Sequence, residues 1–282
     1  MIYFDYSATT PMSDAALKTY EHVARKFFAN SRSLHSFGEE SETVLNLSRK
    51  KIAQSLGVEA DEIYFTGSGS EATFLALTGL ALAHQHKGRT IVTTQGEHHS
   101  VHQALFYLQR LGFSIRYVPV NEFGEVTIDN LSTTIDDDTI LVTIAHANSE
   151  IGTVQNIAEI GRFLARQNIL FHSDCVQTFG KLPIPSEHLS SLTVSAHKCY
   201  GPKGVGAAYI QRELPWVPFL QGTTHENGFR PGTVDVPAIA SFAAAIDEWL
   251  PQAKDEMIRL GKLRARFISA FQAEERVVFE GH

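Results

Sequence analysis

The chain has 282 residues, of which 43% are hydrophobic and 20% are charged. This apolar content is sufficient for a sizeable core, which excludes a disordered chain, and the length predicts two domains or one large α/β unit. Lys and Arg number 24 against 31 Asp and Glu, which gives a formal net charge of −7 and argues against sequence-independent nucleic-acid binding.

Cysteine content and the N-terminal segment both favour a cytoplasmic protein. The two cysteines, Cys175 and Cys199, cannot form a disulfide framework, and there is no CxxC motif. The segment MIYFDYSATT lacks the basic and apolar regions of a signal peptide. No apolar run approaches the ~20 residues of a membrane helix, so we expect no membrane partner.

Short apolar segments with strand character alternate with helix-length segments along the chain. Residues 1–50 are interpreted as an N-terminal arm with one helix, and residues 236–275 as helical with a break at Pro251. The last residues, 276–282, resemble the first strand of another unit. The expected strands are 63–65, 90–94, 115–118, 139–145, 169–173, 192–195 and 205–210, and the expected helices are 14–28, 70–83, 98–110 and 157–167.

This alternation predicts an α/β fold. Its strands are apolar without alternation, which is typical of a mostly parallel sheet covered by helices on both faces. Such sheets bind ligands at the carboxyl ends of their strands. Motifs that carry chemistry are therefore expected where the strands end.

A glycine-rich turn, FTGSGSEAT, follows the strand 63–65. Backbone N–H groups near Gly69 and the start of the next helix predict an anion site, to which Ser70 could add a hydroxyl. The alternative is a plain turn in which Ser70 caps the helix. The string also matches GxGxxA, a dinucleotide fingerprint that carries little weight by itself, since some 60 residues precede this strand.

Asp174 directly follows the apolar strand 169–173. A carboxylate in a dry site needs a partner, and a protonated ring nitrogen would serve. Gln177 could donate a hydrogen bond to the same ring. The alternative for Asp174 is a helix cap.

Lys198 lies in SAHKCYGPKGVGAAY, after the strand 192–195. If desolvated, its amine loses basicity, becomes nucleophilic and can condense with an aldehyde cofactor. The alternative is an ordinary surface lysine, an interpretation that fits Lys203 better.

Three further elements complete the set. An imidazole in GEHHSV, that of His98 or His99, could stack on a planar ring, Asn148 follows the strand 139–145, and RPGT brings Thr233 into a polar loop. His98 and His102 have the spacing of a metal pair, but no third ligand has suitable spacing, so no metal is expected. Together, an anion turn, a ring-nitrogen partner, a ring stacker and a nucleophilic lysine predict a site for pyridoxal 5′-phosphate (PLP).

The sequence resembles the NifS/IscS-like cysteine desulfurases, which are class V aminotransferase-fold PLP enzymes. The matching strings run in the family's order along nearly the whole chain: YFDYSATTP, FANSRSLHSFG, FTGSGSEAT, GEHHSV, NSEIGTVQ, HSDCVQTFGK, SAHKCYGPKGVGAAY and ENGFRPGTVDV. The resemblance implies the PLP-dependent transferase fold type I, with a seven-stranded sheet. It also implies an arm at 1–15 belonging to a small domain, a large PLP-binding domain at 16–255, and at 256–282 the start of a small domain that is largely missing.

The resemblance also implies a role for each matching residue. Lys198 would hold PLP covalently and, with His98 stacked on the ring, would be catalytic. Asp174 would pair with the ring nitrogen, Gln177 with the phenolic oxygen, and Asn148 would lie beside it. Phosphate would be held by Gly69, Ser70, Ser195 and His197, and Thr233 would reach the phosphate of the other subunit of a homodimer.

The implied reaction converts L-cysteine to L-alanine and passes sulfur on as a persulfide, for iron–sulfur cluster or thiocofactor assembly through an acceptor protein. Nucleic acid would be involved only if the acceptor were a tRNA-modifying enzyme. The family's nucleophilic cysteine and its substrate-binding arginine lie beyond His282, so we expect impaired activity in this chain. Gly222-Thr223-Thr224 replaces a glycine triplet, and Pro231 replaces a small polar residue.

Other functions remain open at this point. A selenocysteine lyase or an aminotransferase of the same fold would share the PLP site. A nicotinamide oxidoreductase built on GSGSEA would need neither Lys198 nor Asp174. A non-catalytic binding protein could keep the scaffold alone.

Overall fold

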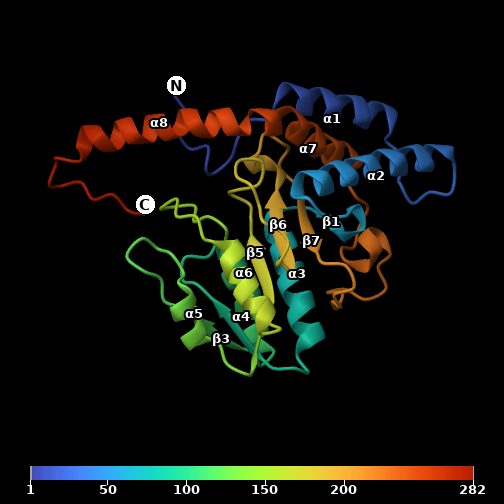
Figure 1. The fold of residues 1–282 in the computed structure, drawn as a ribbon. Helices are drawn as coiled ribbons and strands as arrows, with labels where there is room; N and C mark the ends of the chain where they lie inside the picture. Colours follow the sequence, from blue (N-terminus) through green and yellow to red (C-terminus); the bar gives the residue numbers. More distant parts are fainter. Residues whose placement is uncertain (1, 282) are drawn as a thin grey trace.

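The computed structural model describes residues 2–281, and within them seven strands form a single sheet (Figure 1). The strands are β1 (Ile63–Thr66), β2 (Thr90–Thr93), β3 (Ser114–Tyr117), β4 (Thr139–Thr143), β5 (Leu170–Asp174), β6 (Ser191–Ser195) and β7 (Gly206–Ile210). Their order across the sheet is β1-β7-β6-β5-β4-β2-β3. Neighbours from β3 to β6 are parallel, and β7 is antiparallel to both β6 and β1, which confirms the predicted mostly parallel sheet.

Helices cover both faces of this sheet, as predicted. They are α1 (Asp14–Lys26), α2 (Ser36–Leu56), α3 (Gly69–His84), α4 (His99–Arg110), α5 (Ile128–Thr134), α6 (Ile157–Arg166), α7 (Val236–Trp249) and α8 (Ala253–Phe271). Successive side chains of a strand point to opposite faces. Ile91 and Leu141 accordingly pack with α3 and α4, whereas Val92 and Val142 share a core with α2, α6 and α7.

The position of β1 bears on the dinucleotide interpretation. β1 is an edge strand, and its one partner in the sheet, β7, runs antiparallel to it. A dinucleotide-binding fold places its glycine turn after a parallel strand at the centre of the sheet. The topology therefore disfavours a nicotinamide site at the turn that follows β1.

Two parts of the chain differ from the sequence-based expectation. The segment interpreted as polar arm contains a 21-residue helix, α2, capped by His35 and ended by Gly57 in the left-handed region at φ 69°. Residues 276–281, expected as a strand, form none. The expected break at Pro251 is confirmed, because α7 ends at Trp249 and a 3₁₀ turn, Leu250–Gln252, separates it from α8.

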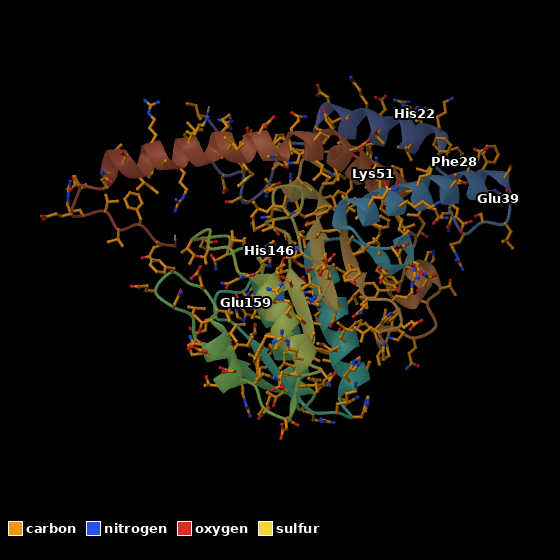
Figure 2. The ribbon with its side chains drawn as sticks, in the orientation of Figure 1. His22, Phe28, Glu39, Lys51, His146 and Glu159 are labelled. Carbon is orange, nitrogen blue, oxygen red and sulfur yellow. The ribbon has the colours of Figure 1, made fainter. Side chains whose placement is uncertain are left out.

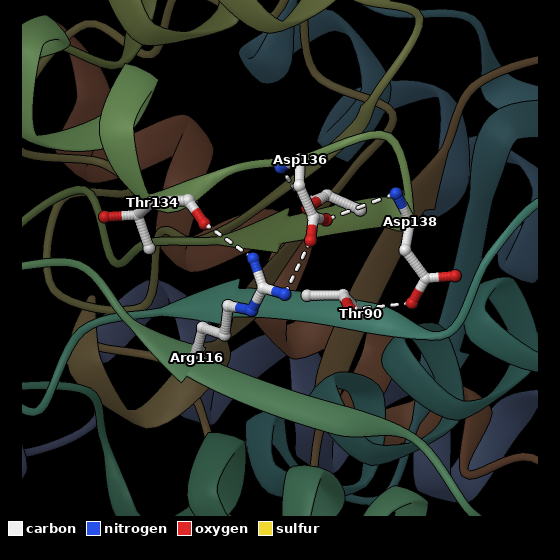
Figure 3. A network of polar contacts seen from close by, with 6 residues as sticks. Thr90, Arg116, Thr134, Asp136 and Asp138 are labelled. Carbon is white, nitrogen blue, oxygen red and sulfur yellow. Dashed lines mark hydrogen bonds and ion pairs between the residues drawn. The ribbon is translucent and has the colours of Figure 1, made fainter.

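The amino ends of β2 and β4 are tied to the edge strand β3 by polar contacts (Figure 3). Arg116 on β3 forms an ion pair with Asp136 at 2.5 Å and donates to the carbonyl of Thr134 at 3.3 Å. Thr90 donates to Asp138 at 2.8 Å. These contacts fix the end of the sheet opposite the expected site.

α8 projects away from the body of the molecule (Figure 1). Of its residues only Ala253 is buried, and apolar side chains such as Leu263 and Phe267 are exposed. The division into an arm, a large domain and a small domain stays a prediction. Among residues 2–281, no helix combines the length and the hydrophobicity that a membrane crossing requires.

Candidate active site

A cavity of about 270 Å³ opens at the carboxyl ends of the central strands. Every predicted site residue except Thr233 contributes to its wall: Gly69, Ser70, His98, Asn148, Asp174, Gln177, Ser195, His197 and Lys198. Thr233 instead lines a separate hollow of about 90 Å³ beside Arg230. We call the first of these the cofactor cavity.

The turn after β1 leads into the N-terminus of α3 and forms one end of the cofactor cavity. Ser68, not Ser70, is the N-cap, and its hydroxyl accepts a hydrogen bond from the N–H of Glu71 at 3.1 Å. The first N–H groups of a helix have no intrahelical acceptor, so those of Gly69 and Ser70 are available to an anion. Arg230 pairs with Glu71 at 3.1 Å, and Glu71 also accepts from the N–H of Gly67.

Gly206 is required by the close approach of this turn to β7. A Cβ atom at position 206 would overlap the backbone of Ser68 and the N–H of Gly69. We expect Gly206→Ala to displace the turn and weaken PLP binding about tenfold or more, since overpacking costs about 1–3 kcal/mol. Fluorescence titration with PLP measures this.

Gly261→Ala is the matched control for this prediction. Nothing lies within 4 Å of a Cβ at position 261, and alanine favours the helix there. It should bind PLP like the wild type. Unchanged PLP affinity in Gly206→Ala would contradict the assignment of the turn.

Asp174 ends β5 with its carboxyl group in the wall of the cavity. It is 6% exposed; Oδ1 accepts from the N–H of Val176 at 2.9 Å, so it also caps the following turn. Burial, the largest influence, raises the pKa of Asp174, while the backbone N–H of Val176 and the positive charges of His98 and Lys198 act against it. His98 and Lys198 act on Asp174 electrostatically, but none of the ion pairs among residues 2–281 includes it, so a cationic ring nitrogen would be its ion-pair partner.

Hydrogen bonds of His146 fix the backbone around Asp174. Its carbonyl accepts from the N–H of His146 at 2.9 Å, and the ring of His146 pairs with Thr178 at 2.9 Å. Figure 2 labels His146 close to the middle of the molecule. Burial lowers the pKa of His146 to about 4, so this ring is neutral at neutral pH and adds no charge to the site.

Lys198 lies in a 3₁₀ turn, Ala196–Lys198, directly after β6. Its side chain is half-buried, and burial is the largest influence that lowers its pKa, opposed by the carboxylates of Asp174, Asp5 and Glu150. A lowered pKa enlarges the fraction of neutral amine, which is the nucleophilic form. By contrast, Lys203 is exposed and lines none of the cavity wall.

The N-terminal arm lies across the cofactor cavity, which the sequence did not indicate. The carbonyl of Ser7 accepts from Nζ of Lys198 at 2.5 Å and from Nε2 of Gln177 at 3.1 Å. Thr10 donates both its N–H and its hydroxyl to the carbonyl of His197. Ala8 contributes to the cavity wall. The arm thus fixes the turn that carries the candidate lysine.

His98 and Asn148 also line the cofactor cavity. His98 caps α4, and its Nδ1 contacts both the hydroxyl of Ser100 at 2.7 Å and the N–H of Ser100 at 3.2 Å, which sets the ring orientation. Asn148 donates to the carbonyl of Gly96 at 2.9 Å. The structure therefore places His98, predicted to stack on the ring, and Asn148, predicted to lie beside it, in the wall of the same cavity. Their roles stay predictions.

The residues present fit PLP. The cavity offers a helix N-terminus for a phosphate, a buried carboxyl group without a counter-ion for a ring nitrogen, and a half-buried amine for an aldehyde. Within residues 2–281 no group of three or more His, Cys, Asp or Glu side chains has the arrangement of a metal site.

Comparison with known proteins agrees with this geometry. Residues 2–265 match the family model of aminotransferase class V. The chain is 46% identical to a NifS protein of Halalkalibacterium halodurans over all of this chain and 75% of that protein. It is 40% identical to the cysteine desulfurase IscS of Dictyoglomus turgidum over 98% of this chain and 70% of that protein.

A solved structure titled as a NifS-like protein superimposes with a TM-score of 0.92 at 36% identity and covers 96% of this chain and 75% of its own. This likeness confirms the predicted fold type, and members of this family use PLP. The chain belongs to the class V aminotransferase family, within its NifS/IscS-like cysteine desulfurases.

Proposed function

We propose that this protein is a PLP-dependent cysteine desulfurase. It would convert L-cysteine to L-alanine and pass the sulfur to a thiol as a persulfide. The observation that carries the proposal is that one cavity holds both the half-buried amine of Lys198 and the buried, unpaired carboxyl group of Asp174. The family membership supports cysteine as the substrate.

When bound, PLP supplies an aldehyde that links reversibly to amines and a cationic ring that withdraws electrons from the substrate's Cα. The chain's own residues would do the rest. Asp174 would keep the proton on the ring nitrogen, and the Nζ of Lys198 would take the proton from Cα and return a proton to the product. His98 would pack on the ring, and the N-terminus of α3 would hold the phosphate.

The net reaction balances without an external oxidant. The C–S bond of cysteine breaks and an S–S bond forms with the acceptor thiolate, which is oxidised to a persulfide. The carbon that loses sulfur keeps the electron pair and gains a proton, which gives alanine. The active site therefore has to supply a proton and a base but no redox centre.

Neither cysteine of the described chain is placed to accept the sulfur. Cys175 and Cys199 are fully buried, and neither contributes to the cavity wall. Burial raises the pKa of each thiol to about 12, so thiolate is scarce at neutral pH. The acceptor thiol in this proposal therefore comes from outside the described residues.

The inertness of these thiols is a testable expectation. In the folded protein we expect Cys175 and Cys199 to react with Ellman's reagent at least about 100-fold more slowly than a free thiol, because thiolate is the reactive form. After denaturation in guanidinium chloride both should react at once. Rapid labelling of either thiol in the native chain would contradict their exclusion as sulfur acceptors.

We further propose a cytoplasmic homodimer that serves iron–sulfur cluster or thiocofactor assembly through an acceptor protein. The two unpaired cysteines support a reducing compartment. Thr233 supports the dimer, because it lies outside the cofactor cavity of its own chain and would be free to meet a phosphate in a second copy. Light scattering and sedimentation test the dimer directly.

The proposed activity is tested by loading the protein with PLP and adding L-cysteine. Dithiothreitol is added as the acceptor thiol, because neither Cys175 nor Cys199 is placed to accept sulfur. We expect alanine and sulfide in equal amounts. A protein that binds PLP and releases no alanine would overturn the desulfurase assignment. Alanine release from selenocysteine but not from cysteine would reassign it as a lyase.

A further inference from the structure

A second cavity, of about 330 Å³, lies against the cofactor cavity. The two share Gly96, Ala145 and Asn148 in their walls. The second cavity is otherwise lined mainly by apolar side chains, and no lysine or arginine of the described chain contributes to it. Glu97 contributes to its wall.

Glu97 joins the ends of two neighbouring strands. Its Oε1 accepts from the hydroxyl of Thr94, which follows β2, at 2.8 Å, and from the N–H of Ala145, which follows β4, at 3.0 Å. Glu97 is 8% exposed, and its Oε2 is buried without a hydrogen-bond partner among the described residues. Two donors therefore converge on one oxygen, and the other is left for a proton.

We propose that Glu97 is a positioning residue of the cofactor site: by tying the ends of β2 and β4 together, it fixes where His98 and Asn148 stand in the wall of the cofactor cavity. His98 is the next residue, and Asn148 lies three residues after Ala145. The bond from Asn148 to the carbonyl of Gly96 joins the same two loops beside Glu97. The inference rests on the proposed function only in that the cavity holds PLP.

Glu97 links the ends of β2 and β4 in its uncharged form. Burial is the main cause that raises its pKa to about 8, and the negative charge of Asp174 at the end of β5 adds to it. Across the second cavity, Tyr117 on β3 and Gln155 present polar groups, and neither carries a positive charge. Asp174, not Glu97, is the acidic side chain that lines the cofactor cavity, where a cationic ring would lie.

The first test compares Glu97→Gln, Glu97→Ala and the control Glu62→Gln. The glutamine keeps an oxygen for both donors, so it should bind PLP within about twofold of wild type and keep the circular-dichroism band of the bound cofactor. The alanine leaves the N–H of Ala145 unpaired, which should weaken PLP binding about tenfold or more and alter that band. Glu62 is also buried and also accepts two backbone N–H groups, but it lies in neither cavity, so Glu62→Gln should change neither readout.

The second test needs no cofactor and covers the case in which Glu97→Ala does not fold. Urea unfolding of wild type and Glu97→Gln is measured from pH 5 to 9. Folded Glu97 keeps its proton up to about pH 8, whereas unfolded glutamate releases it above about 4.5. The unfolding equilibrium constant of wild type should therefore rise relative to Glu97→Gln by up to about tenfold per pH unit and level off above pH 8.

Three results would overturn the inference. The first is a Glu97→Ala variant with the PLP affinity and circular-dichroism band of the wild type. The second is a Glu97→Gln variant whose PLP affinity and dichroism band change as much as those of Glu97→Ala. The third is an unfolding equilibrium constant that depends on pH in the same way in wild type and Glu97→Gln. A wild type that binds no PLP would instead refute the proposed function. Bound PLP without alanine release would refute the desulfurase assignment and leave the Glu97 inference intact.

Discussion

Replacing Lys198 by alanine should abolish covalent attachment of PLP and reduce alanine production by at least about 10³-fold. The variant loses both the amine that links to the aldehyde and the base that takes the Cα proton, each of which contributes orders of magnitude to the rate. The helix N-terminus and Asp174 remain, so non-covalent PLP binding should persist. The measurements are the absorption spectrum with PLP and alanine release from L-cysteine.

Lys203→Ala is the matched control for this experiment. Lys203 lies five residues further along the same loop but is exposed and outside the cofactor cavity. It should keep the wild-type spectrum and turnover. If Lys198→Ala still released alanine at a rate close to wild type, the assignment of the base would be wrong.

Asp174→Asn should lower the turnover of L-cysteine by about 10²-fold or more while the chain still folds. Asparagine keeps the shape and can still accept from the N–H of Val176, so the turn after β5 is preserved. It cannot balance a positive charge, so the ring nitrogen of PLP would lose its proton and with it much of its capacity to withdraw electrons. Removing this carboxylate also removes a charge that raises the pKa of Lys198.

Asp174→Glu provides the rescue arm of that test. It restores the carboxylate at a displaced position, so turnover should lie between those of wild type and Asp174→Asn. The turnover number, KM and pH profile are measured for all three proteins. Wild-type turnover in Asp174→Asn would contradict the pairing with the ring nitrogen.

The strands, and the end of the sheet at which the site lies, were predictable from the sequence. Strands that are buried on both faces lack the alternation of polar and apolar residues, and this pattern is easy to recognise. The runs at β4 and β5 are buried almost throughout and show no polar–apolar alternation, and parallel strands place their following loops at one edge. That is why Asp174, Asn148 and Lys198 could be expected together from sequence alone. Their convergence needed only the fold class and not the details of packing.

α2 was not predicted from the sequence, because several residues on its buried face are small or polar. Gly38, Ser41 and Ser48 occupy positions of the stripe, and the two serine hydroxyls donate to backbone carbonyls such as Phe37 and Val44. Such small side chains let the helix pack closely against its neighbours, yet they interrupt the hydrophobic period that Leu45, Ile52 and Leu56 would otherwise show. The helix therefore became visible only in the structure.

Two contributors to the site had no usable signal in the sequence. Ser7 acts through its carbonyl, which any residue type would provide, so its contact with Lys198 depends on where the arm lies. Glu97 precedes a candidate residue, but only burial and its bond to Ala145 distinguish it from a surface acid. Tertiary placement, rather than residue type, makes both part of the site.

The role of Lys198 is tested most directly by reducing the PLP-loaded protein with borohydride and mapping the modified peptide by mass spectrometry. We expect a single lysine to carry the mass of reduced PLP, and we expect that lysine to be Lys198. An unmodified chain, or modification of Lys203 or another lysine while Lys198 stays free, would contradict it.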